Sequence, residues 1–233
     1  MAKRPSTGRS APGRPPSGRR RASQARSKAT VGRILDSATA LIVEKGPDAV
    51  TMTEIARRAK VVIGSLYQYF ADRSAIHRAL LLRHHEEVRD MLAGYLSGIG
   101  NFTDFLASIE AAAAKYYDLH QSDPIYNGIW SAVQTDAELQ RLDLADTLKN
   151  ARQLHAISRP LLPAVDSDEL MATCALLIQF ALTTGRFART MPPALKRQML
   201  PIYRRILRTS LDALYAENAH NASRKSGPPA ARR

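Results

Sequence analysis

The feature that most constrains this chain is a pair of short helical patterns joined by a turn, between Thr51 and Phe70. Thr51 and Glu54 have the spacing of a capping box, in which each side chain hydrogen-bonds to the backbone N–H of the other residue. Apolar residues recur at helical spacing on both sides of a break at Val61. Helices this short cannot each bury a face alone, so they must pack on each other and on a third helix. That is the helix-turn-helix arrangement, whose second helix enters the major groove of DNA.

The third helix is predicted from Ala29 to Lys45, where apolar residues form a regular stripe before Gly46 and Pro47 end it. Residues 29–76 are therefore predicted to form a three-helix head. Further helical stripes follow one another through residues 77–219, with no strand pattern between them. We therefore predict an all-α fold, in which the helix-turn-helix head sits on a body of roughly six helices.

The net charge of +13 is concentrated at the two ends of the chain. Residues 1–28 hold nine Lys or Arg and no acid, residues 220–233 hold four and no acid, and the remainder is balanced. Both ends lack apolar periodicity, so we predict disordered basic tails there. Such a charge distribution suits a polyanion partner, and the N-terminal tail could follow a DNA groove.

Several other classes of protein are disfavoured. Cys174 is the only cysteine, which excludes an intrachain disulfide and fits a reducing cytoplasm. No uninterrupted apolar run reaches the roughly 18 residues of a membrane helix, so no membrane partner is expected. The chain has no metalloprotease motif, nucleophile elbow or phosphate-cradling loop, so we expect no enzyme and no cofactor. His84 and Glu87 share a helical face, but no third ligand is fixed by spacing, and no metal site is predicted.

The helix-turn-helix stretch resembles the N-terminal signature of the TetR family of bacterial transcriptional regulators. The resemblance rests on Ile55, Ala56, Ala59, Val61, Gly64, Leu66, Tyr67, Tyr69, Phe70 and Arg73. Two positions depart from the family pattern, because Lys60 stands where glycine is usual and Val62 where serine or threonine often caps the second helix. We therefore expect a lysine in a left-handed turn, at a cost of roughly 1 kcal/mol, and an uncapped second helix.

Eight residues are expected to contact DNA. Four of them lie on the second helix away from its apolar stripe, at Ile63, Gly64, Ser65 and Gln68. Gln68 can pair with an adenine edge, Ser65 can bond a base in either groove, and Ile63 can meet a thymine methyl group. The resemblance implies phosphate contacts for four more residues, Thr51, Tyr67, Tyr69 and Arg73.

The resemblance also implies a body that binds a small molecule and pairs with a second copy. Aromatic or buried-looking polar residues that could line a pocket are Phe105, Tyr116, Tyr117, Trp130, Gln134 and Cys174. The same residues could equally be ordinary core. The stretch from Leu170 to Phe187 is apolar nearly all round, so it should be buried on more than one side. This pattern favours a homodimer that forms through the last two helices.

These features predict a cytoplasmic regulator that binds a double-stranded DNA operator. The resemblance implies that it is a repressor released by a small-molecule effector. The alternative is an architectural or non-specific DNA-binding protein driven by its basic tails, which would show steep salt dependence and no preferred sequence. A helical enzyme or small-molecule carrier is disfavoured because the catalytic motifs are absent.

Overall fold

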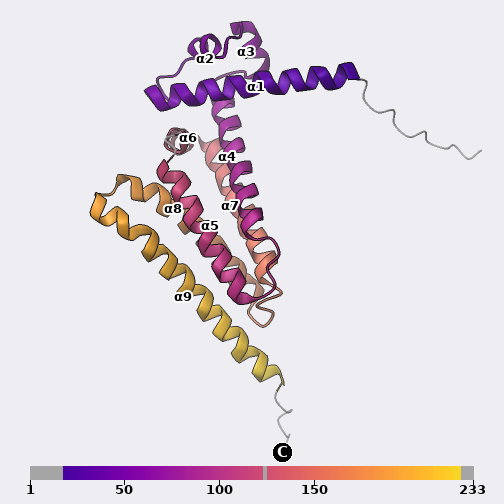
Figure 1. Cartoon of the computed structure of the whole chain (residues 1–233), viewed down its shortest axis with the longest axis vertical. Coiled ribbons are helices and arrows are strands. Elements are labelled where there is room, and N and C mark those ends of the chain that lie inside the picture. The colour runs from indigo at the N-terminus through magenta and orange to yellow at the C-terminus, as the bar shows by residue number, and fades with distance from the viewer. Residues whose placement is uncertain (1–17, 123–124, 227–233) are drawn as a thin grey trace, which may run out of the picture.

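The computed structural model describes residues 18–122 and 125–226, and these residues form nine helices and no strand (Figure 1). The predicted all-α class is therefore confirmed. The helices are α1 (Gly18–Lys45), α2 (Met52–Ala59), α3 (Ile63–Tyr69), α4 (Arg73–Tyr95), α5 (Phe102–Ser122), α6 (Ile125–Thr135), α7 (Ala137–Ser158), α8 (Ser167–Thr190) and α9 (Pro193–Ser226).

The head is built from α1, α2, α3 and the start of α4 around one apolar core. Ile34 of α1, Leu66 of α3 and Ile76 of α4 are fully buried in it. Asp72 caps α4, because its carboxylate accepts a hydrogen bond of 2.7 Å from the N–H of Ala75. Figure 1 shows α4 running from the head down into the body, so one continuous helix joins the two parts.

The core of the head also includes residues from beyond the boundary predicted at residue 76. Ile129 and Val133 of α6 are buried in the same apolar cluster as the helices of the head. The contact with α1 is close, because a Cβ on Gly128 would lie 2.1 Å from Cγ2 of Ile42. Any larger residue there would require the Ile42 side chain to shift. The core of the head is therefore completed by residues of α6, which lie beyond the predicted boundary at residue 76.

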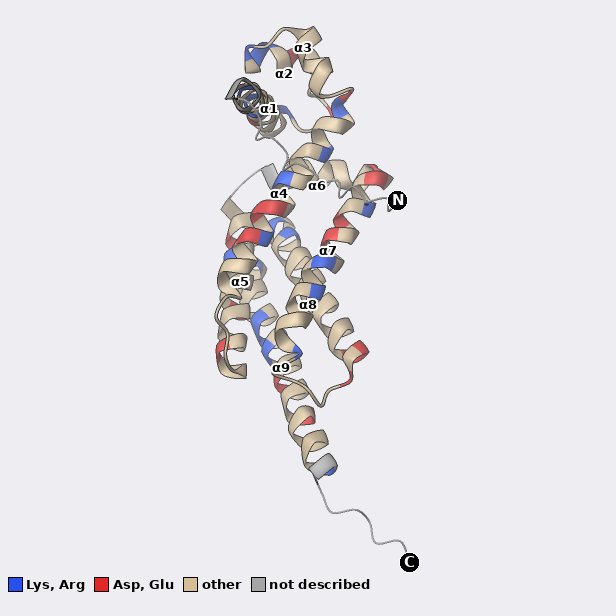
Figure 2. Ribbon diagram, turned by 90° about the vertical axis from the view of Figure 1, so that its right-hand side faces the viewer, with Lys and Arg blue, Asp and Glu red and all other residues tan. Residues whose placement is uncertain are grey.

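The body packs α5, α7, α8 and α9 with the lower half of α4 around a second core. Phe105, Leu162 and Leu170 are fully buried there. Glu110 of α5 is buried too, and its carboxylate accepts hydrogen bonds from Arg204 at 3.2 Å and Arg208 at 2.8 Å, both on α9. Figure 2 shows acidic and basic residues interspersed along α4 and α7, as the balanced charge of the central sequence implies.

Both ends of the described chain correct the predicted tails. Helix α1 begins at Gly18 rather than Ala29, because residues 18–28 contain no proline and hold four arginines and two alanines. Good helix formers extend an existing helix at little cost. Helix α9 continues past residue 219 to Ser226, and Asn218 and Asn221 fix it by hydrogen bonds to the backbone of Ala164 at 2.7 and 3.2 Å. The rest of both predicted tails lies outside the described residues.

Helix α8 is long and apolar enough to cross a bilayer, by length and composition alone, and it is the one such helix among the described residues. The core helix of a globular protein passes the same test, and α8 packs against α5, α7 and α9. Only 28% of its most apolar window is buried within the single chain. An apolar face of α8 is therefore left uncovered.

Candidate DNA-binding head and body pocket

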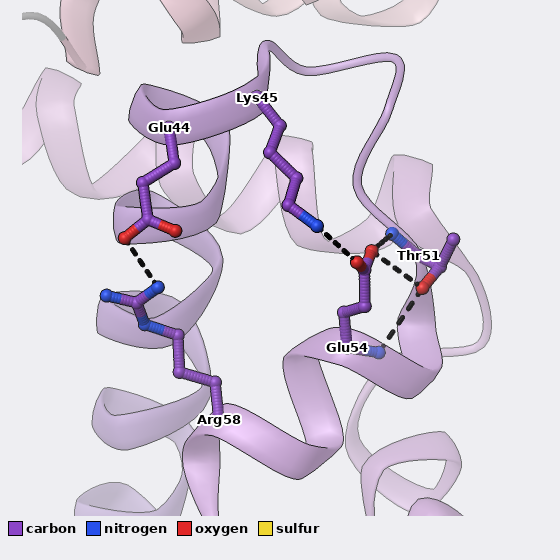
Figure 3. Close-up of polar contacts among 5 residues, drawn as sticks. All are labelled: Glu44, Lys45, Thr51, Glu54 and Arg58. Atoms are coloured by element: carbon purple, nitrogen blue, oxygen red, sulfur yellow. Dashed lines mark hydrogen bonds and ion pairs between the residues drawn. The ribbon is translucent and has the colours of Figure 1, made fainter.

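Helix α2 starts with the predicted capping box (Figure 3). The Thr51 hydroxyl accepts a hydrogen bond of 3.2 Å from the N–H of Glu54, and the Glu54 carboxylate accepts one of 3.1 Å from the N–H of Thr51. Hydrogen bonds from Lys45 and then from the Thr51 hydroxyl lower the pKa of Glu54 to about 2. The carboxylate therefore stays ionised at neutral pH and keeps the first turn of α2 closed.

Two ion pairs place α2 on the end of α1 (Figure 3). Nζ of Lys45 lies 2.5 Å from Glu54, and Nη1 of Arg58 lies 2.6 Å from Glu44. All four side chains are partly exposed, so each pair contributes little to stability. Together they join the first and last turns of α2 to the end of α1, while Ile55, Ala56 and Ala59 pack α2 into the core of the head.

The turn between α2 and α3 has the left-handed residue that the sequence predicts. Lys60 has φ 54° and ψ 45°, and it is the one residue other than glycine with positive φ in the described parts of the chain. The N–H of Val61 donates to the carbonyl of Ala56 and the N–H of Lys60 to that of Arg57. These two bonds form a Schellman motif, which usually has glycine at the position of Lys60. Val62 makes no side-chain cap on α3, also as predicted.

Helix α3 presents an exposed surface that carries no charge of its own. Leu66 is fully buried, whereas Ile63, Tyr67 and Tyr69 keep between 39% and 51% of their surface exposed. Gln68 and Gly64 are exposed as well, and Ser65 is half-buried. A Cβ on Gly64 would meet no atom within 4 Å, so packing inside the chain does not require a glycine there. The exposed face therefore includes the residues predicted to meet base edges.

The cations near α3 come from neighbouring elements. Arg57 and Lys60 are exposed and form no ion pair with any other described residue. Arg73, a predicted phosphate contact, donates a hydrogen bond of 2.6 Å to the carbonyl of Asp48, before α2. Thr51, the fourth predicted phosphate contact, is exposed while its hydroxyl closes the capping box. This arrangement surrounds an uncharged helix face with basic and hydroxyl groups, which suits a phosphate backbone on either side of a groove.

The body contains two small adjacent cavities. The upper one, about 30 Å³, has many polar groups in its wall, including His84, His120, Asn150 and Arg186. The lower one, about 40 Å³, is lined almost entirely by apolar side chains. Four residues line both cavities, namely Val88, Tyr116, Asn150 and Leu182. The two spaces therefore lie on either side of a single layer of side chains.

Two histidines in the wall of the upper cavity, His84 and His120, have lowered pKa values. Burial, together with nearby cationic and histidine side chains, lowers the pKa of His84 to about 3 and that of His120 to about 4. Both rings are thus neutral at pH 7. Arg186 lies over the ring of Trp130, with its guanidinium carbon 3.2 Å from the ring centroid, and burial lowers its pKa as well. The cavity wall therefore combines one guanidinium with neutral imidazole groups.

The residues predicted to line a pocket separate into three groups. Tyr116 and Trp130 line the cavities. Phe105 and Cys174 are buried in the body core, where burial raises the pKa of the Cys174 thiol to about 11. Tyr117 instead donates a hydrogen bond of 3.2 Å to the carbonyl of Lys196, and Gln134 is exposed. His84, His120, Asn150 and Arg186 line the upper cavity but were not among the predicted pocket residues.

Two sequence models match successive parts of the chain. Residues 34–80 match the bacterial regulatory proteins of the tetR family, and residues 104–215 match the tetracyclin repressor-like C-terminal domain. The chain is a member of the TetR family. The first match covers α2, α3 and their turn, which identifies the head as the DNA-binding helix-turn-helix of a TetR-family transcriptional regulator.

Individual relatives agree with this assignment. The chain is 31% identical over 110 residues to the HTH-type transcriptional activator FasR of Mycolicibacterium smegmatis, a match that covers 47% of this chain and only 49% of FasR. A TetR-family regulator from Streptomyces coelicolor has the same fold, with a TM-score of 0.61, 21% identity and coverage of 80% of this chain and 98% of that one. RolR in complex with resorcinol is also similar, with a TM-score of 0.58, 18% identity and coverage of 84% and 95%.

Proposed function

We propose that this TetR-family protein is a homodimeric repressor that binds a specific DNA operator and is released by a small organic effector. The observation that carries the proposal is the exposed face of α3, where Gln68, Ser65 and Ile63 are free of the core while Leu66 anchors the helix. With no charge on α3 itself, affinity would come from phosphate contacts around it and specificity from the neutral side chains.

Dimerisation is supported by apolar side chains left exposed on the last two helices. Leu176, Phe180 and Phe187 recur at helical spacing on α8, and each exposes 44% or more of its surface. Ile202 and Ile206 are similarly exposed on α9. Contiguous exposed apolar residues are typical of interaction sites. A second copy that packs the same two helices against these would form a four-helix interface and bring two heads to successive major grooves, about 34 Å apart.

The effector would act through the cavities in the body. Their walls include residues of α4, which is continuous with the head. Movement of that wall would therefore shift α3. The effector's influence is set by its differential affinity for the two head arrangements. RolR, solved with resorcinol, shows that a protein of this fold binds a small molecule.

The opposite sense of regulation, activation, is the second candidate, because the relative FasR is described as an activator. A reporter gene behind the selected operator separates the two. Repression predicts higher expression when the regulator is deleted, and activation predicts lower expression.

The decisive experiment is selection of bound sequences from random double-stranded DNA by the purified full-length chain. We expect a palindromic site whose half-sites lie about one helical turn apart. The absence of any preferred sequence, with binding that falls steeply with salt, would instead support the tail-driven architectural alternative.

Gln68→Ala then tests how the site is read. We expect a loss of about 1–3 kcal/mol confined to one base pair of each half-site, because an amide pairs with one adenine edge. Arg57→Gln is the matched comparison, since loss of a phosphate contact weakens binding to all sequences alike and lowers the salt slope by about 1. An equal loss of affinity for every sequence with Gln68→Ala would show that Gln68 reads no base.

A further inference from the structure

The wall of the upper cavity holds a cation without a counter-ion. Arg186 of α8 is half-buried and stacked on Trp130, yet it forms neither a hydrogen bond nor an ion pair with any other described residue. Arginine in such a setting is normally paired. Burial lowers the pKa of Arg186, and Tyr116 and Asp143 oppose that shift, but Asp143 does not lie within ion-pair distance of the guanidinium.

The acidic residues of the same cavity are already partnered. Asp146 pairs with Arg89 of α4 and accepts a hydrogen bond of 3.0 Å from the amide of Asn150. Asp143 lies 3.3 Å from Nε2 of His85. Because both carboxylates have other partners, neither occupies the guanidinium of Arg186, whose hydrogen-bond donors remain available to a ligand.

A second polar group at the junction of the cavities also lacks a partner. Asn150 is only 3% exposed, and its side-chain carbonyl Oδ1 accepts no hydrogen bond. A buried acceptor without a donor costs free energy, which a ligand hydroxyl or bound water can recover. Arg186 and Asn150 thus mark a polar end for a ligand at the upper cavity.

The lower cavity favours the opposite chemistry. Leu154, Leu177 and Leu207 are among its apolar lining residues, and the hydroxyl of Tyr203 is already used by the carbonyl of Leu177 at 2.9 Å. Transfer from water into such a space lowers the free energy of an apolar group, whereas a polar group would lose its hydrogen bonds to water. Since this cavity shares a layer of side chains with the upper one, a single molecule can occupy both if that layer moves.

We infer that the effector is an amphipathic organic anion, with its charged group beside Arg186 and its apolar part in the lower cavity. The inference rests on the proposed function, because it treats the cavities as the effector site. The spaces of about 30 and 40 Å³ hold little more than water, so such a ligand enters by displacing Val88 of α4 and Leu182 of α8. That displacement is also what would move the head.

The chain carries its own reporter for this test, because Trp130 is its only tryptophan and Arg186 lies over its ring. We would titrate the full-length protein, without DNA, with decanoate below its micelle-forming concentration and with decanol as the uncharged match. Trp130 emission should change with both, and decanoate should bind at least roughly tenfold tighter, since hydrogen bonds to charged groups are the stronger ones. Equal affinity for the acid and the alcohol, or no binding of either, would overturn the inference.

Substitutions of single arginines test which charge causes the preference for decanoate over decanol. Arg186→Gln should remove the preference for decanoate, whereas Arg152→Gln, which deletes an exposed charge on α7, should keep it. Preference that survives Arg186→Gln would overturn the assignment of the polar end. Arg186→Lys keeps the charge and should keep the preference, and the wild-type comparison of acid with alcohol remains decisive if Arg186→Gln fails to fold.

A DNA measurement keeps the two hypotheses apart. Addition of decanoate to the protein–operator complex should release the DNA, and decanol at the same concentration should release less. Failure to select any operator overturns the proposed function, whereas operator binding with no response to decanoate overturns only the inference. Decanoate binding to the free protein without DNA release would show that the anion is not the effector.

Discussion

Lys60 offers a direct measurement of the strain in the turn before the recognition helix. Its φ of 54° is in the left-handed region, where a side chain costs roughly 1–2 kcal/mol relative to glycine. Glycine loses more backbone entropy on folding, which offsets about 0.5–1 kcal/mol of this gain. Lys60 is exposed and makes no ion pair among the described residues, so its replacement removes no other stabilising contact.

Lys60→Gly should therefore raise the free energy of unfolding by about 0.5–1 kcal/mol, the difference of those two effects. For a chain of this size the melting temperature should rise by roughly 1–4 °C. Urea denaturation and thermal melting at one fixed protein concentration give both values. The concentration must be fixed because a dimer's apparent stability depends on it.

Lys60→Ala is the matched control, because it removes the same charge and keeps the Cβ that causes the strain. It should leave stability close to that of the wild type. If Lys60 also contacts a phosphate, both variants should lower the salt slope of operator binding by about 1. A loss of stability in Lys60→Gly, or an equal gain in Lys60→Ala, would refute the argument from the left-handed turn.

Three further predictions concern the head, the cavity and the body core. Gly64→Ala should raise the free energy of unfolding by up to about 0.5–1 kcal/mol, because the added Cβ meets no atom within 4 Å. It should also weaken operator binding. Denaturation measures the stability and gel-shift titration the affinity, and unchanged affinity would contradict close approach of the helix to DNA. Acidification from pH 7 to pH 5 should lower the free energy of unfolding by about 2 kcal/mol for each of His84 and His120, because their pKa values are depressed and the unfolded chain binds more protons there. Urea titrations at both pH values test this, and a variant with both histidines changed to asparagine should lose that part of the dependence. Tyr203→Phe should cost about 1 kcal/mol because its buried hydroxyl donates a hydrogen bond, whereas Tyr215→Phe, on an exposed ring, should be neutral by the same denaturation assay.

The local rules of helix ends explain why the head could be predicted so closely. The capping box at Thr51, the left-handed Lys60 and the uncapped start of α3 each depend on residues within six positions of one another. Such interactions are set by the backbone around them, and the tertiary fold changes them little.

The body was less predictable because its buried faces are not simply apolar. On α7 the sequence pattern favours Leu144 as a core residue, yet Leu144 is 58% exposed while Asp146 and Asn150 are buried. Their burial depends on Arg89 of α4, which is 57 residues away from Asp146 in the chain. Hydrophobic periodicity cannot identify a buried polar pair whose partner lies on another helix. Arg186 was left out of the predicted pocket because its contact is with the ring of Trp130 on α6, which the pattern of α8 alone does not reveal.

The contact between Gly128 and Ile42 has a consequence for the construction of hybrid regulators. A head exchanged at residue 76 would leave behind Ile129 and Val133, which complete its core, and would meet a foreign α6 in their place. In a donor whose α6 carries even an alanine at the position of Gly128, the added Cβ would clash with the Ile42 side chain of α1. Exchanges of DNA specificity in this protein should therefore replace the exposed residues of α3 alone, or transfer α1 through α4 together with α6.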